Sequence, residues 1–271
     1  MWKYLIVLLL WSGNATAQKS SDEIWVLPSP WLSQPDSVFV IRPDNYNGTS
    51  QKYPVVYLLH GYTGSFRQWP RVTDCRYLAN LYQAVIICPD AFSSWYISSP
   101  YDSGSRMEDF FFRTLVPYVH SHVAVDTANI FISGLSMGGY GALRYFLRHP
   151  GYFNTAASTS GALTTDYALL KKVWSTDRML KDITRYMGNP KTEWEQHGIP
   201  YLLTHAKEKP KPFLLDCGTE DVLLPATLRV KKVCDSLKIP VTMTLQPGNH
   251  SRAYWKKSIA QHFLFFKESM R

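Results

Sequence analysis

The middle of this chain reads Gly134-Leu135-Ser136-Met137-Gly138. This pentapeptide follows a short apolar run, Asn129–Ile132, and leads into Gly139–Phe146, whose residues predict a helix. A strand, a G-x-S-x-G turn and a helix form a nucleophile elbow, which lifts a serine hydroxyl out of the edge of a sheet. Glycines are expected on both sides of the serine because side chains do not fit beside so sharp a turn. The alternative is a glycine-rich connection without chemistry.

A serine hydroxyl becomes a nucleophile when a base, usually His, and an orienting carboxylate lie beside it. Both residue types follow the elbow, each on a loop directly after an apolar strand. His250 ends the loop Pro247–His250, and Asp221 ends the loop Gly218–Asp221. Asp216 lies within the preceding strand and is the reserve candidate for the acid. The order Ser, acid, His is the order found in α/β-hydrolases.

An acyl-transfer site also needs two N–H donors for the oxyanion. One is expected from the backbone of Met137, directly after the nucleophile. The other is expected from the loop His60–Ser65, which follows the apolar strand ending at Leu59, and Tyr62 N–H is the preferred donor. His60 is expected to brace this loop by hydrogen bonds and not to act as the base.

Aromatic residues cluster on the same loops. Trp69 follows the oxyanion loop, Trp95 and Tyr96 follow the next strand, and Trp255 follows His250. We expect these four residues to line a groove for a planar or sugar-bearing acyl ester, because aromatic faces bind both groups. For any single aromatic residue, packing in the core is the alternative.

The pattern of strands and helices predicts an α/β fold, with a mostly parallel central sheet and helices on both faces. Residues 163–209 contain polar helical segments and no buried strand, so they are expected to form a cap insertion. The expected strands are Glu23–Leu27, Ser37–Ile41, Pro54–Leu59, Ala84–Cys88, Asn129–Ile132, Thr155–Ser160, Phe213–Cys217 and Val241–Leu245. The expected helices are Thr73–Tyr82, Met107–His122, the helix after Ser136, Pro225–Leu237 and Tyr254–Lys267. The first two strands are expected to form an antiparallel pair at one edge.

The chain ends and the composition favour an exported single domain. Met1–Lys3 is followed by the apolar run Tyr4–Trp11 and the small residues Ala15–Ala17, which together are typical of a signal peptide over residues 1–17. An uncleaved anchor is the alternative. Residues 18–271 would form one domain with a net charge of +7, from 28 basic and 21 acidic residues.

Basic residues and metal-binding residue types are both scattered. Lys207, Lys209 and Lys211 form the densest basic group, which favours a solvated face over a nucleic-acid site. No His or Cys group has metal-ligand spacing, so neither a metal nor another cofactor is expected. The chain has four cysteines, and export would permit one disulfide, with Cys75–Cys88 as an even alternative to four free thiols.

Together these segments resemble the esterase D-like family of α/β-hydrolases. The resemblance rests on Tyr53–Gly61, Ser94–Tyr96, Gly134–Ala142, Asp216–Asp221 and Pro247–His250. The family includes S-formylglutathione hydrolases, feruloyl and acetyl xylan esterases, and mycolyltransferases. It implies the same nucleophile, acid, base and oxyanion amides as the residues themselves. One departure is Asn249, directly before His250, where relatives often carry Gly.

The expected activity is that of an exported serine carboxylesterase, acting on feruloyl or acetyl esters linked to carbohydrate. An S-formylglutathione-type thioesterase is an alternative activity. It is not the first choice, because an exported enzyme would not meet a cytosolic glutathione thioester. A second alternative is an acyltransferase that passes the acyl group to a sugar or another alcohol. A third is a catalytically silent carbohydrate-binding protein on the same scaffold. The sequence does not separate hydrolysis from transfer, because that difference depends on how well the site excludes water.

Overall fold

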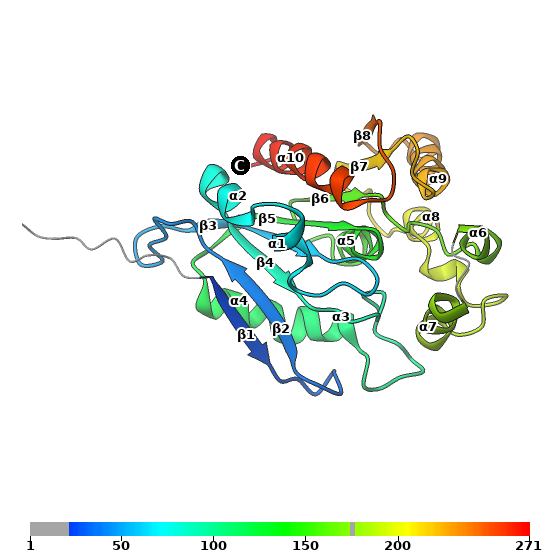
Figure 1. The fold of residues 1–271 in the computed structure, drawn as a ribbon, viewed down its shortest axis with the longest axis horizontal. Helices are drawn as coiled ribbons and strands as arrows, with labels where there is room; N and C mark the ends of the chain where they lie inside the picture. The colour runs from blue at the N-terminus through cyan, green and yellow to red at the C-terminus, as the bar shows by residue number, and fades with distance from the viewer. Residues whose placement is uncertain (1–21, 174–176) are drawn as a thin grey trace, which may run out of the picture.

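An eight-stranded sheet runs through residues 22–173 and 177–271, the part of the chain that the computed structural model describes (Figure 1). The strand order is β1-β2-β4-β3-β5-β6-β7-β8. β1 and β4 both pair antiparallel with β2, and the other neighbouring strands are parallel. The strands are β1 (Glu23–Leu27), β2 (Asp36–Ile41), β3 (Tyr53–Leu59), β4 (Val85–Pro89), β5 (Val125–Leu135), β6 (Thr155–Thr159), β7 (Phe213–Gly218) and β8 (Val241–Gln246). The mostly parallel sheet with an antiparallel edge pair is therefore confirmed.

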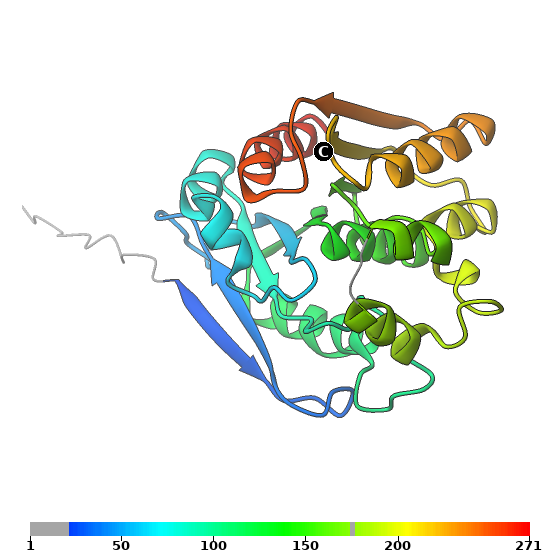
Figure 2. The same cartoon turned by 45° about the vertical axis from the view of Figure 1, so that its right-hand side comes forward.

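Helices cover both faces of this sheet (Figures 1 and 2). On one face, apolar side chains of α1, α2 and α10 pack against the strands. On the other face, the larger apolar cluster joins the strands to α3, α4, α5, α8 and α9. The helices are α1 (Gln68–Val72), α2 (Cys75–Tyr82), α3 (Met107–Phe110), α4 (Val116–His122), α5 (Met137–Arg148), α6 (Tyr167–Val173), α7 (Asp177–Met187), α8 (Ile199–Thr204), α9 (Leu224–Ser236) and α10 (Arg252–Glu268). The helices thus bury the central strands on both sides, whereas the edge strands β1 and β8 are partly exposed.

Several elements differ locally from the sequence prediction. The helix expected from Thr73 begins at Cys75, because the Asp74 side chain caps it by accepting a hydrogen bond from the Tyr77 N–H. The helix expected over Met107–His122 contains a π-helical stretch, Phe111–Leu115, between α3 and α4. β5 is longer than the apolar run that predicted it. None of these changes alters the order of the elements.

The segment between β6 and β7 contains α6, α7, a 3₁₀ turn (Glu195–His197) and α8. Its described residues form no strand. Trp194 is buried there, and its indole N–H donates to the Gly188 carbonyl oxygen over 2.9 Å. Leu170, Ile183 and Leu203 of the segment belong to the same apolar cluster as the strands, so the segment packs onto the domain. Its role as a cap stays a prediction.

The four cysteines are free and buried, so the alternative of a Cys75–Cys88 disulfide is not realised. Burial raises the pKa of the Cys75 thiol to about 12, because a thiolate is costly away from water. Both thiols of that pair pack in the cluster under α2 and α10. They behave as small apolar core residues.

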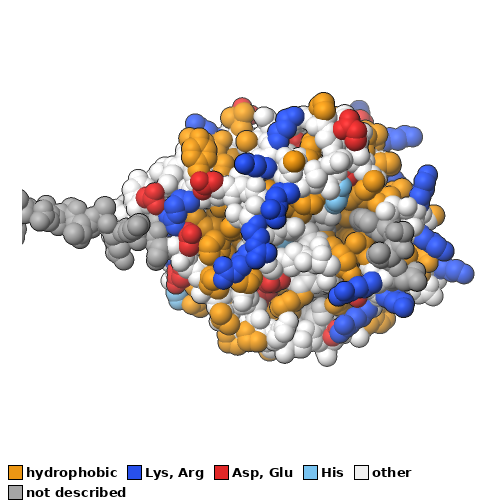
Figure 3. Space-filling view, viewed as in Figure 1, with side chains coloured by type: hydrophobic (Ala, Val, Ile, Leu, Met, Phe, Trp, Pro, Cys, Tyr) orange, Lys and Arg blue, Asp and Glu red, His pale blue; other side chains and the backbone are white. Residues whose placement is uncertain are grey.

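The expected signal peptide, residues 1–17, lies outside the described residues. Within the described part, every helix is too short or too polar to span a bilayer. Lys and Arg side chains lie at several places on the face drawn in Figure 3, with hydrophobic and uncharged atoms between them.

His262 is a titratable group that the fold buries completely. Its Nδ1 lies 2.7 Å from Ser133 Oγ, so the histidine joins α10 to the underside of β5. Burial lowers the pKa of His262 to about 3. The ordinary value for an unfolded chain is near 6.5. Between these values the unfolded state binds a proton that the folded state does not bind.

Replacing His262→Asn is expected to flatten the acid side of the stability profile. For the wild type, one proton taken up on unfolding lowers the free energy of unfolding by on the order of 1 kcal/mol per pH unit as the pH falls below about 6.5. Asn keeps a polar partner for Ser133 and removes this titration. Urea denaturation at pH 5 and pH 7 measures both profiles. Equal pH dependence in the two proteins would contradict a buried neutral imidazole.

Candidate active site

Ser136 lies at the junction of β5 and α5, on a turn with an unusual backbone. Its φ is 55° and its ψ is −117°, a conformation that few residues other than glycine adopt. The Ser136 N–H donates to the Thr159 carbonyl oxygen, and the Ala162 N–H donates to the Ser136 carbonyl oxygen, both over 3.1 Å. These two bonds anchor the strained turn to the end of β6 and to the loop after it.

The flanking glycines allow the backbone to approach itself closely. A Cβ atom on Gly138 would lie 2.2 Å from the Leu59 carbonyl oxygen, and one on Gly134 would lie 2.1 Å from the Gly138 carbonyl oxygen. Such distances are far inside van der Waals contact, and the atoms in the way are backbone. Any other residue at Gly138 would push the turn away from the end of β3, and any other residue at Gly134 would push the first turn of α5 away from β5.

Three distant segments bring a hydroxyl, an imidazole and a carboxylate together. His250 Nε2 lies 3.0 Å from Ser136 Oγ, and His250 Nδ1 lies 3.1 Å from both carboxylate oxygens of Asp221. The His250 side chain is 23% exposed, whereas the Asp221 side chain is fully buried. This arrangement can move a proton from the hydroxyl to the imidazole and hold the resulting positive charge.

The environment of Asp221 keeps its carboxyl group ionised. Burial opposes the charged form, but the hydrogen bond and the charge of His250 outweigh it and hold the pKa of Asp221 below its usual range. The Leu223 N–H adds a hydrogen bond of 2.8 Å to Asp221 Oδ1.

The reserve candidate, Asp216, is placed differently. It lies within β7 and accepts a hydrogen bond from Thr159 Oγ1 over 3.1 Å, and burial raises its pKa to about 6.

The acid loop and the histidine loop are held to each other by a contact that the sequence did not predict. The Glu220 N–H donates to the Gly248 carbonyl oxygen over 3.0 Å. In return, the Gly248 N–H donates to the Glu220 carboxylate. This reciprocal pair continues the parallel pairing of β7 with β8 beyond the strand ends. It fixes Asp221 and His250 relative to each other.

The expected oxyanion loop lies directly against the serine. A Cβ atom on Gly61 would be 3.4 Å from Ser136 Cβ. The Gly61 N–H donates to Gln68 Oε1 over 2.7 Å, and His60 Nδ1 lies 2.8 Å from the Gly61 carbonyl oxygen. The expectation that His60 braces the loop is therefore confirmed.

The two amides proposed as oxyanion donors are unengaged. Within the described chain, neither the Tyr62 N–H nor the Met137 N–H donates to another protein group. Met137 is the first residue of α5, where N–H groups have no partner inside the helix. Both amides are thus available to an atom outside the protein.

Comparison with known proteins shows which family the chain belongs to. Residues 29–266 match the protein family described as "Putative esterase". The chain belongs to this esterase family.

Individual relatives have several activities. The chain is 25% identical over 261 residues to an acetyl esterase from Caldicellulosiruptor saccharolyticus, covering 91% of this chain and 92% of the relative. The crystal structure of an S-formylglutathione hydrolase from Staphylococcus aureus superposes with a TM-score of 0.78 at 25% identity, covering 91% of this chain and 98% of the other. A ferulic acid esterase superposes with a TM-score of 0.79 at 22% identity, covering 93% and 99%. The α/β-hydrolase fold and the esterase D-like family are therefore confirmed, and the protein is a carboxylic ester hydrolase.

Three of the four aromatic residues expected to line a groove are core residues of this esterase. Trp69 is 1% exposed, and its indole N–H donates to the Leu59 carbonyl oxygen over 2.9 Å. Tyr96 is fully buried, and its hydroxyl donates to the His60 carbonyl oxygen over 2.9 Å. Trp95 is also buried, between the rings of Tyr62 and Tyr140. These side chains support the oxyanion loop from behind, which corrects their assignment to substrate contact.

Trp255 is the exception among the four. It is half-buried, and its ring stands edge-on to the His250 ring, with the centroids 5.1 Å apart. Trp255 therefore remains a candidate for substrate contact at one side of the candidate site.

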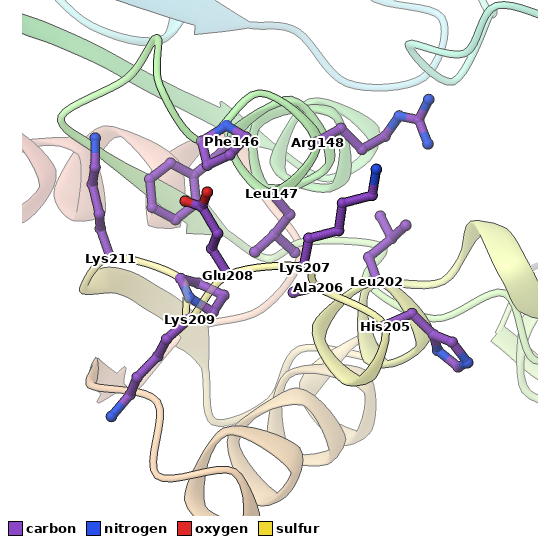
Figure 4. A pocket seen from close by; sticks show the side chains of 12 residues that line it. Phe146, Leu147, Arg148, Leu202, His205, Ala206, Lys207, Glu208, Lys209 and Lys211 are labelled. Atoms are coloured by element: carbon purple, nitrogen blue, oxygen red, sulfur yellow. The ribbon is translucent and has the colours of Figure 1, made fainter.

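A cavity of about 430 Å³ lies elsewhere in the esterase (Figure 4). Phe146, Leu147 and Arg148 from the end of α5 line one side, and the segment Ala206–Lys211 lines another. Because α5 starts beside Ser136 and rises about 1.5 Å per residue, this cavity lies on the order of 15 Å from the serine. Its cations are partly engaged, since Arg148 pairs with Glu108 and Lys211 donates to a backbone carbonyl oxygen. Ser136, Asp221 and His250 do not line this cavity.

The described residues contain no cluster of three or more His, Cys, Asp or Glu side chains suited to a metal ion. The candidate site consists of the side chains of Ser136, Asp221 and His250 and the expected oxyanion amides of Tyr62 and Met137, with Trp255 beside His250.

The different placements of Trp69 and Trp255 predict different effects of their removal. Trp69→Ala is expected to lower the free energy of unfolding by about 3–5 kcal/mol, because it empties a buried site. Trp255→Ala is expected to cost less stability and to raise KM for an aryl ester. Urea denaturation and steady-state kinetics measure the two effects. A larger loss of stability in the Trp255 variant would contradict this division.

Proposed function

We propose that the protein is an exported serine carboxylesterase that hydrolyses feruloyl or acetyl esters linked to carbohydrate. Ser136 is the nucleophile, His250 the general base and acid, and Asp221 the residue that orients His250. The observation that carries these roles is the position of His250, with one ring nitrogen 3.0 Å from the serine hydroxyl and the other 3.1 Å from a buried carboxylate.

The proposed reaction has two halves. Ser136 Oγ attacks the ester carbonyl carbon while its proton passes to His250 Nε2, and a tetrahedral intermediate forms. His250 then gives this proton to the leaving alcohol, and the acyl group stays on the serine. In the second half, water loses a proton to His250 and attacks the acyl-enzyme. The acid leaves and the serine is protonated again.

The developing oxyanion would accept hydrogen bonds from the Tyr62 and Met137 amides. Preorganised donors of this kind stabilise the tetrahedral state more than the ground state, each by about 3 kcal/mol. The N-terminus of α5 adds a favourable partial charge at the same point. Apart from the ester substrate, every group in this scheme belongs to the chain itself or is water.

Two observations support the choice of substrate. Relatives named as acetyl and ferulic acid esterases match nearly the whole chain. The sequence of residues 1–17 is typical of a signal peptide, and an exported enzyme would not meet a cytosolic glutathione thioester. Carbohydrate-linked acetyl or feruloyl groups suit an enzyme outside the cell.

The roles in the triad predict the order of three variants. Ser136→Ala is expected to reduce hydrolysis of nitrophenyl acetate to background and to abolish labelling by a fluorophosphonate. Asp221→Asn is expected to lower kcat about 10⁴-fold, because the amide disturbs the histidine tautomer. Asp216→Asn is the matched control and should stay within about tenfold of the wild type. If Asp216→Asn were the more damaging of the two, the assignment of the acid would be wrong.

A small panel of esters tests the substrate. It compares acetyl, butyryl, feruloyl and S-formylglutathione substrates, with the acetyl and feruloyl groups each on a xylo-oligosaccharide and on methanol. We expect the highest kcat/KM for an acetyl or feruloyl sugar ester. Adding a free acceptor sugar and analysing the products separates hydrolysis from acyl transfer. A clear preference for the glutathione thioester would overturn the proposed substrate class but not the triad.

A further inference from the structure

A hydrogen bond joins the oxyanion loop to helix α7, although the two are 120 residues apart in the chain. The Tyr62 hydroxyl donates to Asp182 Oδ2 over 2.6 Å. Both side chains are half-buried. Tyr62 is the residue whose amide is proposed to bind the oxyanion. Its bond to Asp182 therefore links that amide to a helix outside the loops that carry Ser136, Asp221 and His250.

The base of the loop is well fixed, but its tip is strained. Gln68 and His60 hold Gly61 by hydrogen bonds. The next residue but one, Thr63, has a φ of 59°, a left-handed conformation that costs free energy for a residue with a Cβ atom. Tyr62 lies between the fixed and the strained residue. The position of the Tyr62 side chain therefore influences the direction of its own backbone N–H.

Helix α7 provides a firm point of attachment. Arg185, one turn beyond Asp182, forms an ion pair of 2.6 Å with Asp102 in the segment after β4, which lies beside α7 in Figure 2. Ile183 and Met187 of α7 are buried in the core. Because the helix is held independently, Asp182 is a fixed acceptor for the Tyr62 hydroxyl.

The chemistry of the pair keeps the bond in place over the working pH range. Burial, followed by the hydrogen bond and the charge of Asp182, raises the pKa of Tyr62 to about 12. The phenol thus remains a donor. Hydrogen bonds to a carboxylate are among the stronger ones in proteins.

We propose that Asp182 is a positioning residue that, by holding the Tyr62 side chain, aims the Tyr62 N–H at the oxyanion. This inference rests on the proposed function. An oxyanion donor displaced by about 1 Å loses much of its effect on the barrier, while substrate binding is little changed. Through this bond, α7 controls the orientation of an oxyanion donor that lies outside the helix.

Tyr62→Phe and Asp182→Ala, alone and together, test the proposal. Each single variant is expected to lower kcat for nitrophenyl acetate about tenfold, with KM within about twofold of the wild type. The double variant should be no slower than the slower single variant, since both changes remove the same bond. Asp182→Asn, which keeps an oxygen acceptor, should recover most of the activity.

A second readout separates positioning from a general loss of structure. An alkyl boronic acid that forms a tetrahedral adduct with Ser136 is expected to bind about tenfold more weakly to Tyr62→Phe and Asp182→Ala. Lys181→Ala, an exposed neighbour on the same helix, is the matched control and should bind it as the wild type does.

The outcomes distinguish this inference from the proposed function. Additive losses in the double variant, or unchanged boronate affinity in the single variants, would overturn the positioning role. A folded wild-type protein without activity on any ester would overturn the proposed function instead.

Discussion

The close approach of two backbone segments is the constraint on which the candidate active site depends. The turn at Ser136 fits against the end of β3 because Gly138 presents no Cβ atom to the Leu59 carbonyl oxygen. The same contact brings the loop after β3 against the serine. Ser136 and the expected oxyanion loop are thus positioned by one packing event, and the strain at Ser136 is offset by bonds to the end of β6 and the loop after it.

Much of the fold could be predicted from the sequence, because its signals are local and repeated. Buried parallel strands give near-continuous apolar runs, and the pentapeptide around Ser136 marks one strand end. The sequence also predicted His250 and Asp221 as partners of the serine, since parallel strands place their following loops at one edge. The choice between Asp221 and Asp216 followed from position relative to the strand end. Asp216 is still inside β7, where its side chain packs against a neighbouring strand.

Other features could not be predicted, because they depend on packing between distant segments. Trp69 lies in α1 and Tyr96 on the loop after β4, and the side chains of both turn inward and bond to backbone carbonyl oxygens. Neither residue type nor spacing distinguishes an inward from an outward aromatic side chain on a loop. The bond between Tyr62 and Asp182 has no sequence signal, because it joins a loop to a helix with no shared motif. The reciprocal contact of Glu220 with Gly248 likewise has no signal in the sequence.

The four unbridged, buried thiols bear on where the protein can be made. A fold that contains no disulfide needs no oxidant or isomerase to reach its final state. It can form in a reducing cytosol as well as in an oxidising compartment. The thiols are also shielded from oxidants, since their burial disfavours the reactive thiolate. Folding of this chain therefore does not depend on the redox state of the compartment in which it takes place.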